Sequence, residues 1–337
     1  MKNAEGSCSS QKLPILIIGY NRPELIKAAL DKYQTFPVSK IYIAIDGPRD
    51  DNDKIDVYRC RHLVNQCATG NSIIERLFVD QNYGCRRFPE KAITWFFSHE
   101  KIGIVLEDDI QLSQAFFSFA NACLKNPRIS IAASCTYPEY EPNIKRFDCI
   151  VTRIPSIWGW ATTSTTWIDY MNVQSSLPKR LPIMVYEMAP RIGLAKALLF
   201  GLCLRMIHRG ELDAWDYIFA YHLIRNNMLT AFPTERLSCN VGFGEDATHN
   251  KNAHNPTLPF TQSIKIYSQN DIEVRINAGY QAHQALNTPF YPEFRIHILK
   301  GCIRYILDLM IEAAHACIKS LQGLSNQLNR VVTKRPE

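Results

Sequence analysis

Three adjacent carboxylates, Glu107, Asp108 and Asp109, are the residues of this sequence whose type and spacing are best suited to chemistry. They directly follow the apolar run Ile102–Leu106, which is typical of a strand that is buried on both faces, as in a parallel sheet. Ligands of open α/β sheets bind at the carboxyl ends of the strands. Crowded carboxylates repel one another unless a cation holds them, and hard oxygen ligands favour Mg2+ or Mn2+.

The acid cluster therefore predicts a site for a divalent metal ion and the diphosphate that such ions usually share. The alternative is a solvated acidic turn that precedes the next helix. Ser113 is a candidate N-cap of that helix, and Phe116 and Phe117 follow it. The local pattern leaves both interpretations open, and the rest of the chain favours the first.

The residues before the acid cluster alternate between apolar runs and helical patterns. The apolar runs 13–18, 40–45, 72–79 and 102–106 predict strands. The segments 23–33, 50–68 and 86–99 predict helices between them. This order predicts an α/β fold with a mostly parallel sheet.

Polar residues follow the predicted strands, with Asn21 and Arg22 after the first and Asp46 after the second. Together with the acid cluster they predict a nucleotide pocket, although each residue alone is more typical of a turn. The glycines form neither G-x-G-x-x-G nor G-x-x-x-x-G-K-S/T after the first strand. A dinucleotide site and a Walker phosphate loop are therefore disfavoured.

Two tryptophan segments lie in the second half of the chain. Trp158-Gly159-Trp160 is typical of residues that stack on sugars or close a lid, and equally of core packing. Asp213 and Asp216 stand on either side of Trp215, before an apolar helical run at 218–224. An acid at this place is a candidate catalytic base, and the alternative is stabilisation of the helix N-terminus.

A Gly-rich segment, Asn240–Asn250, contains Glu245, Asp246 and His249. A histidine directly after two acids is a candidate metal ligand, although a lone histidine is more often structural. The segment as a whole is typical of a flexible lid.

Composition is that of an ordinary globular protein, with 46% hydrophobic and 21% charged residues. The net charge of +6 suits an anionic substrate or an anionic membrane surface. The 11 cysteines include no C-x-x-C pair, which favours reduced thiols and no zinc site. The polar start lacks the apolar core of a signal peptide, and no run reaches the roughly 18 apolar residues of a membrane span. We therefore expect a cytoplasmic protein without nucleic-acid partners.

Taken in order, these motifs resemble the GT-A fold glycosyltransferases. The resemblance covers roughly residues 13–250 and includes the N-acetylglucosaminyltransferase of N-glycan branching and a family-2-like bacterial group. The Val105–Asp109 run with its two phenylalanines is the most specific part. The segments that support it are Leu13–Leu30, Ile45-Asp46-Gly47, Asn82–Arg86 and Trp158–Trp160.

The resemblance implies roles for the matching residues. Asp109 would bind Mn2+ or Mg2+, and His249, from the Gly-rich segment, is the second metal-ligand candidate. Trp158, Gly159, Trp160 and Trp215 would line the cleft for donor and acceptor. The residues that would bind the nucleotide-sugar are Tyr20, Asn21, Arg22, Asp46, Asn82, Arg86, Glu107 and Asp108. The related enzyme reads Trp-Asp-Asp where this chain reads Trp215-Asp216-Tyr217, so the base is either Asp216 or Asp213.

The expected activity is that of a metal-dependent, inverting glycosyltransferase. It would move a sugar from a nucleotide-sugar, with UDP the favoured nucleotide, to a glycan or lipid-linked acceptor, as in surface polysaccharide synthesis. Two alternatives are a metal-dependent nucleotidyltransferase and a carbohydrate-binding protein without activity. A nucleotidyltransferase usually has a Gly- and Lys/Arg-rich loop after the first strand, where this chain offers Arg22.

The expected domain organisation is a polar tail (1–12), a GT-A domain (13–255) and a C-terminal extension (256–337). The GT-A domain would divide into a nucleotide-sugar half (13–125) and an acceptor half (126–255). In the extension, apolar residues recur at helical spacing from Leu299 to Leu321, which predicts an amphipathic helix. That helix would dock on the domain, pair with a second copy or lie on the inner face of the plasma membrane.

Overall fold

The computed structural model describes residues 12–67, 74–135, 149–174 and 178–242, and the positions 301, 303–306 and 308. The chain divides into two units, Met1–Asn287 and Thr288–Glu337. The described positions of the second unit are helical, and everything below concerns the first. Among the described residues, none of the helices combines the length and the apolar character that crossing a membrane requires.

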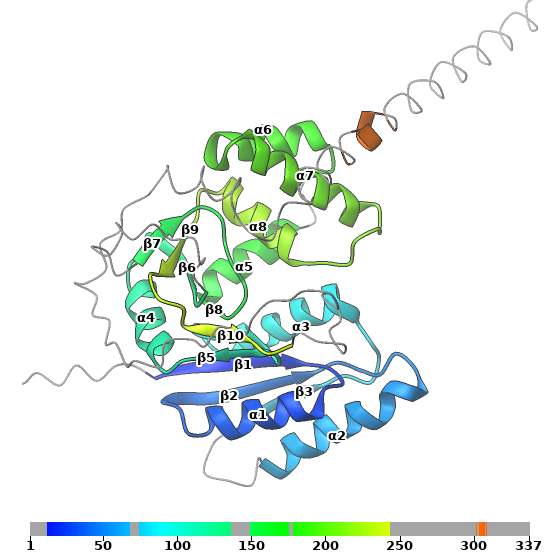
Figure 1. The fold of residues 1–337 in the computed structure, drawn as a ribbon, viewed down its shortest axis with the longest axis vertical. Helices are drawn as coiled ribbons and strands as arrows, with labels where there is room; N and C mark the ends of the chain where they lie inside the picture. The colour runs from blue at the N-terminus through cyan, green and yellow to red at the C-terminus, as the bar shows by residue number, and fades with distance from the viewer. Residues whose placement is uncertain are drawn as a thin grey trace, which may run out of the picture. The chain divides into compact units, whose positions relative to one another are not determined.

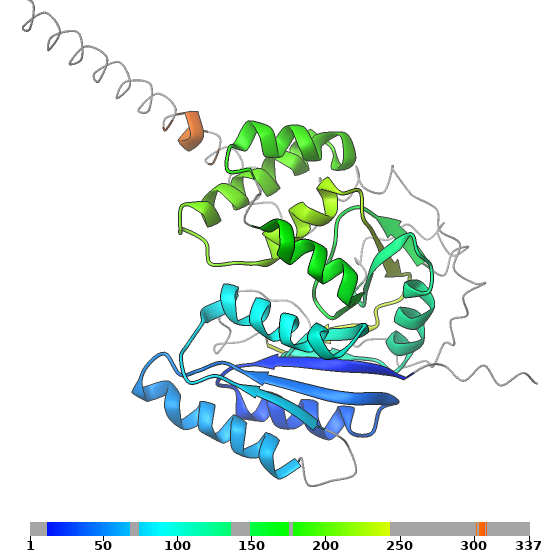
Figure 2. The same ribbon diagram turned by 180° about the vertical axis from the view of Figure 1, so that it is seen from behind.

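The first half of this unit alternates between strand and helix (Figure 1). Its elements are β1 (Leu13–Gly19), α1 (Pro23–Tyr33), β2 (Val38–Ile45), α2 (Asp51–Cys67), β3 (Ile74–Phe78), α3 (Gly84–His99) and β4 (Ile102–Glu107). All four strands are parallel to their neighbours in the order β3-β2-β1-β4. Helices α1 and α2 cover one face of these strands and α3 lies on the other, as both views show (Figures 1 and 2).

The second half completes the same sheet. Its elements are β5 (Ile110–Leu112), α4 (Ala115–Leu124), β6 (Ile129–Ala133), β7 (Cys149–Thr152), β8 (Trp160–Thr163), α5 (Ser164–Val173), α6 (Leu181–Ile192), α7 (Leu194–His208), α8 (Asp216–Arg225), β9 (Leu229–Pro233) and β10 (Ser238–Asn240). The eight-stranded sheet has the order β3-β2-β1-β4-β8-β6-β9-β7, and β8 is antiparallel to both of its neighbours. The predicted α/β class, with a mostly parallel sheet flanked by helices, is confirmed.

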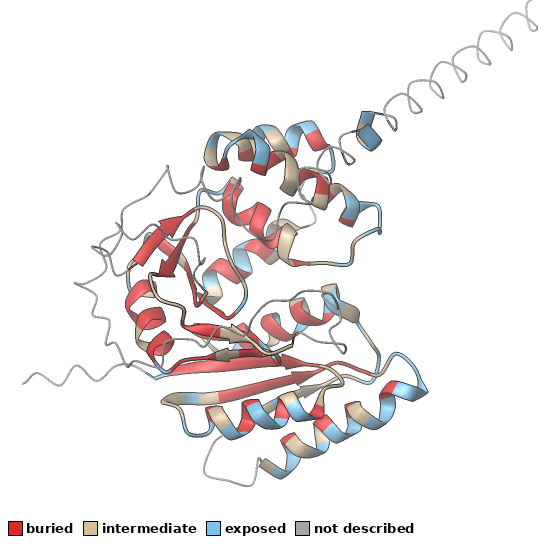
Figure 3. Ribbon diagram, in the orientation of Figure 1, coloured by how far each residue is buried: buried red, intermediate tan, exposed pale blue. Residues whose placement is uncertain are grey.

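Burial explains why the early strands were recognisable from their composition. Every residue of β1 is buried, and so are Gly103–Leu106 in β4 (Figure 3). Central strands covered on both faces contain only apolar residues, and they end where the chain becomes polar.

Two details of the second half matter for the site and its surroundings, and one expectation is wrong. Strand β10 pairs with β5 in a separate two-stranded sheet. Gly193, at φ +82, separates helices α6 and α7. Ser113 does not cap α4, since its hydroxyl is buried without a hydrogen-bond partner among the described residues.

Candidate functional site

The acid cluster lies at the carboxyl end of β4, next to the end of β1. The Asp108 amide donates to the Ile18 carbonyl at 2.9 Å, which continues the pairing of the two strands beyond Glu107. The Asp109 carbonyl accepts from the Val241 amide at 2.8 Å, just after β10. Both aspartates are thus held by backbone hydrogen bonds from segments far apart in the sequence.

Arg22 joins the two aspartates. Its Nε lies 3.3 Å from Asp108 Oδ2, its Nη2 bonds Asp108 Oδ1, and its Nη1 lies 3.2 Å from Asp109 Oδ2. Arg22 directly precedes Pro23, the first residue of α1, so the start of that helix fixes the backbone of the arginine. The repulsion expected between the acids is therefore offset by an arginine of the chain itself.

The electrostatics of the cluster favour protonation. Loss of hydration raises the pKa of Glu107, and repulsion by Asp109 and Asp108 adds to it, although the side chain reaches solvent. Burial also raises the pKa of Asp108, and the Arg22 guanidinium opposes this shift. A further cation placed here would favour the charged forms.

One atom of the cluster fits a metal ion. Asp109 Oδ1 is buried and accepts no hydrogen bond among the described residues. A Cβ added to Gly242 would lie 2.4 Å from Asp109 Oδ2, so a glycine makes room for this carboxylate. No group of three His, Cys, Asp or Glu side chains surrounds a common point in the described part of the chain. Mg2+ commonly binds one or two carboxylates together with substrate phosphates, and Asp109 fits that pattern. His249 lies outside the described residues.

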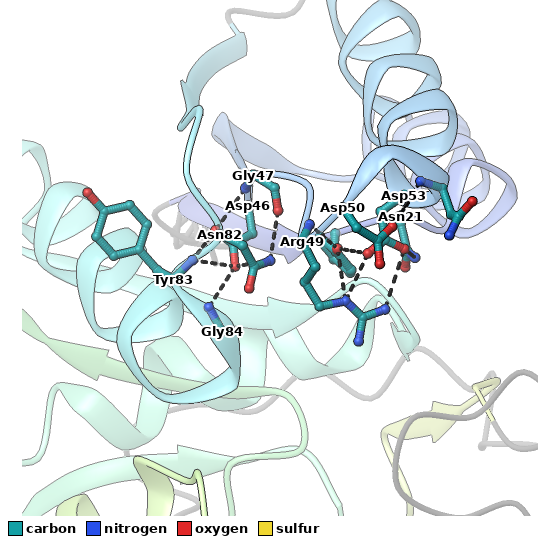
Figure 4. A network of polar contacts seen from close by, with 11 residues as sticks. Asn21, Asp46, Gly47, Arg49, Asp50, Asp53, Asn82, Tyr83 and Gly84 are labelled. Atoms are coloured by element: carbon teal, nitrogen blue, oxygen red, sulfur yellow. Dashed lines mark hydrogen bonds and ion pairs between the residues drawn. The ribbon is translucent and has the colours of Figure 1, made fainter.

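Asp46 holds the start of α3 (Figure 4). Its Oδ1 accepts from the amides of Gly47 (2.8 Å) and Tyr83 (3.0 Å), and its Oδ2 accepts from the Gly84 amide (3.0 Å). The Asn82 side chain adds Nδ2 contacts to Asp46 Oδ2 (3.2 Å) and to the Gly47 carbonyl (2.7 Å). Asp46 is 4% exposed. The Asp46 carboxylate, predicted to bind the nucleotide-sugar, thus accepts hydrogen bonds from backbone amides in this structure.

A second network, which sequence reasoning missed, surrounds Asp53 in the first turn of α2 (Figure 4). The Tyr20 hydroxyl donates to Asp53 Oδ2, and Asn21 Nδ2 lies 2.9 Å from Oδ1. Arg49 Nε lies 2.8 Å from Oδ2, and the guanidinium lies over the Tyr20 ring at 5.4 Å. Hydrogen bonds from Arg49 and Tyr20 lower the pKa of Asp53 to about 2. The only signal in the sequence was the spacing of Arg49 and Asp53, four residues apart.

The two candidate bases approach the sheet edge from the second half of the chain. A Cβ added to Gly84 would lie 3.2 Å from Asp213 Oδ2, so Asp213 packs against the start of α3. Asp216 is the first residue of α8, and its charge contributes to the raised pKa of Glu107. The carboxylates of Glu107 and Asp216, about a hundred positions apart in the sequence, are therefore close enough to interact electrostatically. Both assignments of the base stay predictions.

The charge of Arg86 acts on groups in helices α3 and α5. Its charge opposes the raised pKa values of Glu90, one turn further along α3, and of Tyr170 in α5. The Tyr170 hydroxyl in turn donates to Glu90 Oε1 at 2.7 Å. A nucleotide contact by Arg86 stays a prediction.

The three tryptophans of the predicted donor and acceptor cleft divide into one exposed residue and two core residues. Trp158 is 41% exposed, whereas Trp160 and Trp215 are buried with ring centroids 6.2 Å apart. Trp215 also stacks on Phe219 of α8. Gly159 adopts φ +73, and a Cβ there would lie 2.7 Å from Ser134 Oγ. Core packing thus accounts for Trp160 and Trp215, and a cleft role for Trp158 stays a prediction.

Comparisons with known proteins find similarity to solved structures only. No protein-family model and no curated protein matches the chain. Among solved structures, it is similar to the mannosyltransferase PcManGT from Pyrobaculum calidifontis, in complex with GDP-Man and Mn2+, with 14% identity and a TM-score of 0.34. That match covers 64% of this chain and 69% of the other.

A second similar structure is 4-diphosphocytidyl-2C-methyl-D-erythritol synthase from Anaerococcus prevotii, with 11% identity and a TM-score of 0.32. It covers 50% of this chain and 78% of the other. Neither of the two is an N-acetylglucosaminyltransferase, so that specific resemblance stays a prediction. The function has to be derived from the residues of the site.

Proposed function

We propose that the protein is a metal-dependent glycosyltransferase that moves a sugar from a nucleoside diphosphate sugar to an acceptor hydroxyl. One observation carries the proposal: Asp109 has a buried carboxylate oxygen that accepts no hydrogen bond among the described residues, and other acids lie near the cluster. The charge of Asp216 acts on Glu107, and Asp213 packs against the start of α3. A metal ligand and a separate proton acceptor are the two parts that such a transfer needs.

Each part has a definite task. A divalent cation bound through Asp109 Oδ1 would neutralise the charge that develops on the departing nucleoside diphosphate. Asp216, or Asp213 in its place, accepts the proton of the acceptor hydroxyl as that oxygen attacks the anomeric carbon. One direct displacement, with a single carboxylate as base, inverts the configuration of that carbon.

The neighbouring polar residues would shape the nucleotide-sugar side. Tyr20 and Asn21 are held by Asp53, and Asn82 is held by Asp46, so their side chains are ordered before a ligand arrives. Arg22, between Asp108 and Asp109, keeps two acids of the site in place. UDP is the proposed nucleotide and a glycan or lipid-linked hydroxyl the proposed acceptor. Trp158 is exposed and offers a ring for a sugar to stack on.

Two other functions make different use of the same residues. A nucleotidyltransferase needs cations around the triphosphate of its substrate, and the arginine that follows β1 is already paired with two aspartates. A carbohydrate-binding protein without activity would have no use for a carboxylate oxygen that is buried without a hydrogen-bond partner among the described residues, next to two further acids.

A panel of sugar nucleotides, labelled in the sugar, tests the proposal with and without Mn2+. We expect metal-dependent release of labelled sugar, as slow hydrolysis or as transfer, together with the nucleoside diphosphate. Release of pyrophosphate from a sugar phosphate and a nucleoside triphosphate would instead establish a nucleotidyltransferase. Binding of sugars without either product would establish a binding protein. Asp109→Asn is the loss-of-function variant, and Asp31→Asn, at a 60% exposed carboxylate of α1, is its matched control.

A further inference from the structure

Helix α6 has an apolar surface on the side that faces away from the protein. Its buried residues are Leu181, Met184, Met188 and Ile192. Ile183, Tyr186 and Pro190 recur at helical spacing on the opposite side. Ile183 is 44% exposed and Tyr186 is 80% exposed. The outward side of a surface helix normally carries polar residues, so this pattern requires an explanation.

Helix α7 packs against α6 and carries two exposed apolar residues of its own. A Cβ added to Gly201 would lie 2.6 Å from Leu181 Cδ1 and 3.3 Å from a Val185 methyl group, which shows how closely the helices approach. Leu194, the first residue of α7, is 65% exposed, and Met206 is 41% exposed. Figure 3 shows exposed positions along both helices. We call α6, Gly193 and α7 the hairpin.

The open end of the hairpin is basic. Lys179 and Arg180 are exposed just before α6. His208, the last residue of α7, lies near them, with a hydrogen bond to the Pro178 backbone. Burial lowers the pKa of His208, and the charges of Lys179 and of Arg86 lower it further. Arg209 follows and pairs with Glu211 at 2.7 Å. A helix that lies in the interface of an anionic bilayer inserts its apolar side and places basic residues among the acidic head groups, and Lys179 and Arg180 directly precede the exposed apolar residues of α6.

We propose that the hairpin lies on an anionic membrane surface, with Ile183, Tyr186 and Leu194 in the interfacial region. Its helices have 12 and 15 residues, whereas a membrane span needs about 20, so the hairpin would lie on the bilayer without crossing it. A second copy of the chain is a poorer occupant. A second copy would present the same basic residues, and no exposed position of α6 carries an acidic group to complement them, whereas an anionic bilayer does complement them. The proposal is independent of the enzymatic activity proposed above.

Flotation of the purified full-length protein with vesicles tests the proposal. We expect binding to vesicles of equal parts phosphatidylglycerol and phosphatidylcholine, and weaker binding to phosphatidylcholine alone. The variant I183S/Y186S/L194S should bind at least about tenfold more weakly, since it loses the apolar contacts. K179A/R180A should lose binding to anionic vesicles selectively. The control I55S/Y58S removes apolar side chains of α2 that are 69% and 57% exposed, and should bind like the wild type.

Each other result overturns the proposal. Wild-type protein that stays with neither vesicle type has no such surface, and a serine variant that floats like the wild type shows that another part of the chain binds. Both serine variants are checked by circular dichroism, and K179A/R180A tests the proposal without altering an apolar residue. If ultracentrifugation without lipid shows a wild-type dimer and a monomeric serine variant, the surface is an interface between copies. Donor hydrolysis in solution should be equal in all variants, so failure here leaves the enzymatic proposal untouched.

Discussion

Arg22 holds Asp109 by one carboxylate oxygen only. Its Nη1 lies 3.2 Å from Asp109 Oδ2, while Oδ1 is buried and has no hydrogen-bond donor among the described residues. Burying a carboxylate oxygen without a partner costs free energy. A hydrogen-bond donor or a cation bound to Asp109 Oδ1 would offset that cost.

We therefore predict that the activity requires a divalent cation and that Asp109 binds it. We expect no turnover in EDTA, recovery with Mn2+ or Mg2+, and loss of activity in Asp109→Ala with the fold intact. Titration calorimetry of Mn2+ in the presence of UDP should show binding to wild type and to Asp31→Asn, and none to Asp109→Ala. Full turnover by metal-free protein would contradict the prediction.

The catalytic base gives a second prediction. Asp216→Asn should lower kcat by about 10²- to 10⁴-fold and leave the Kd of the donor nearly unchanged, because a proton acceptor acts in the transition state. Asp169→Asn, at an exposed aspartate of α5, is the control. Near-normal kcat in Asp216→Asn, together with a large loss in Asp213→Asn, would move the role to Asp213.

Asp46 gives a third prediction, which concerns stability. Asp46→Ala leaves the amides of Gly47, Tyr83 and Gly84 without their acceptor, and we expect a loss of about 2–4 kcal/mol in the free energy of unfolding. Asp80→Ala, at a fully exposed carboxylate, should change it by less than about 0.5 kcal/mol. Chemical denaturation measures both.

A second substitution, Asp46→Asn, distinguishes two possible roles of this carboxylate. If the carboxylate only holds the start of α3, Asp46→Asn should raise the KM for UDP-sugar and GDP-sugar donors alike. A selective change for one base would show that Asp46 reads the nucleotide directly.

Lys196 gives a fourth prediction, which concerns pH. Its side chain is 6% exposed, its Nζ has no hydrogen-bond partner among the described residues, and burial lowers the pKa to about 8. The folded state therefore releases this proton at lower pH than the unfolded state. The resulting destabilisation is complete below pH 8 and disappears as the pH rises from about 8 to about 10.5.

Lys196→Met should consequently stabilise the protein at pH 7 by about 1–3 kcal/mol, and by much less at pH 10. Denaturant unfolding at the two pH values measures this difference. Lys54→Met, at an exposed lysine of α2, should show no such dependence. An equal effect of Lys196→Met at both values would show that the ammonium group is compensated in the folded protein.

The sequence was informative where one physical effect dominates. A strand covered on both faces admits only apolar residues, so β1 and β4 were recognisable, and the acids after β4 marked its carboxyl end. The short strand β8, with the sequence Trp-Ala-Thr-Thr, was missed, because its position in the sheet depends on antiparallel pairing with β4 and β6. Such pairing over a long sequence separation leaves no local pattern.

The site residues also divide into those that a local pattern reveals and those that only the fold brings together. Glu107, Asp108 and Asp109 stand together in the sequence and were found together. Asp53 belongs to the charged start of α2, where an acid looks like an ordinary solvated residue, and only the fold brings Tyr20 and Asn21 to it. Trp160 and Trp158 have the same composition around them, and only their burial tells core from surface.

The short pairing of β5 with β10 also determines when the surroundings of Asp109 are completed during synthesis of the protein. The acid cluster leaves the ribosome long before residues 238–242, yet the Val241 amide and the bare backbone of Gly242 form one wall of the Asp109 environment. A nascent chain that ends before this strand carries the acids without that wall. The metal-dependent chemistry that we propose for Asp109 would therefore become available only late in translation, and fragments that end near residue 125 should lack it.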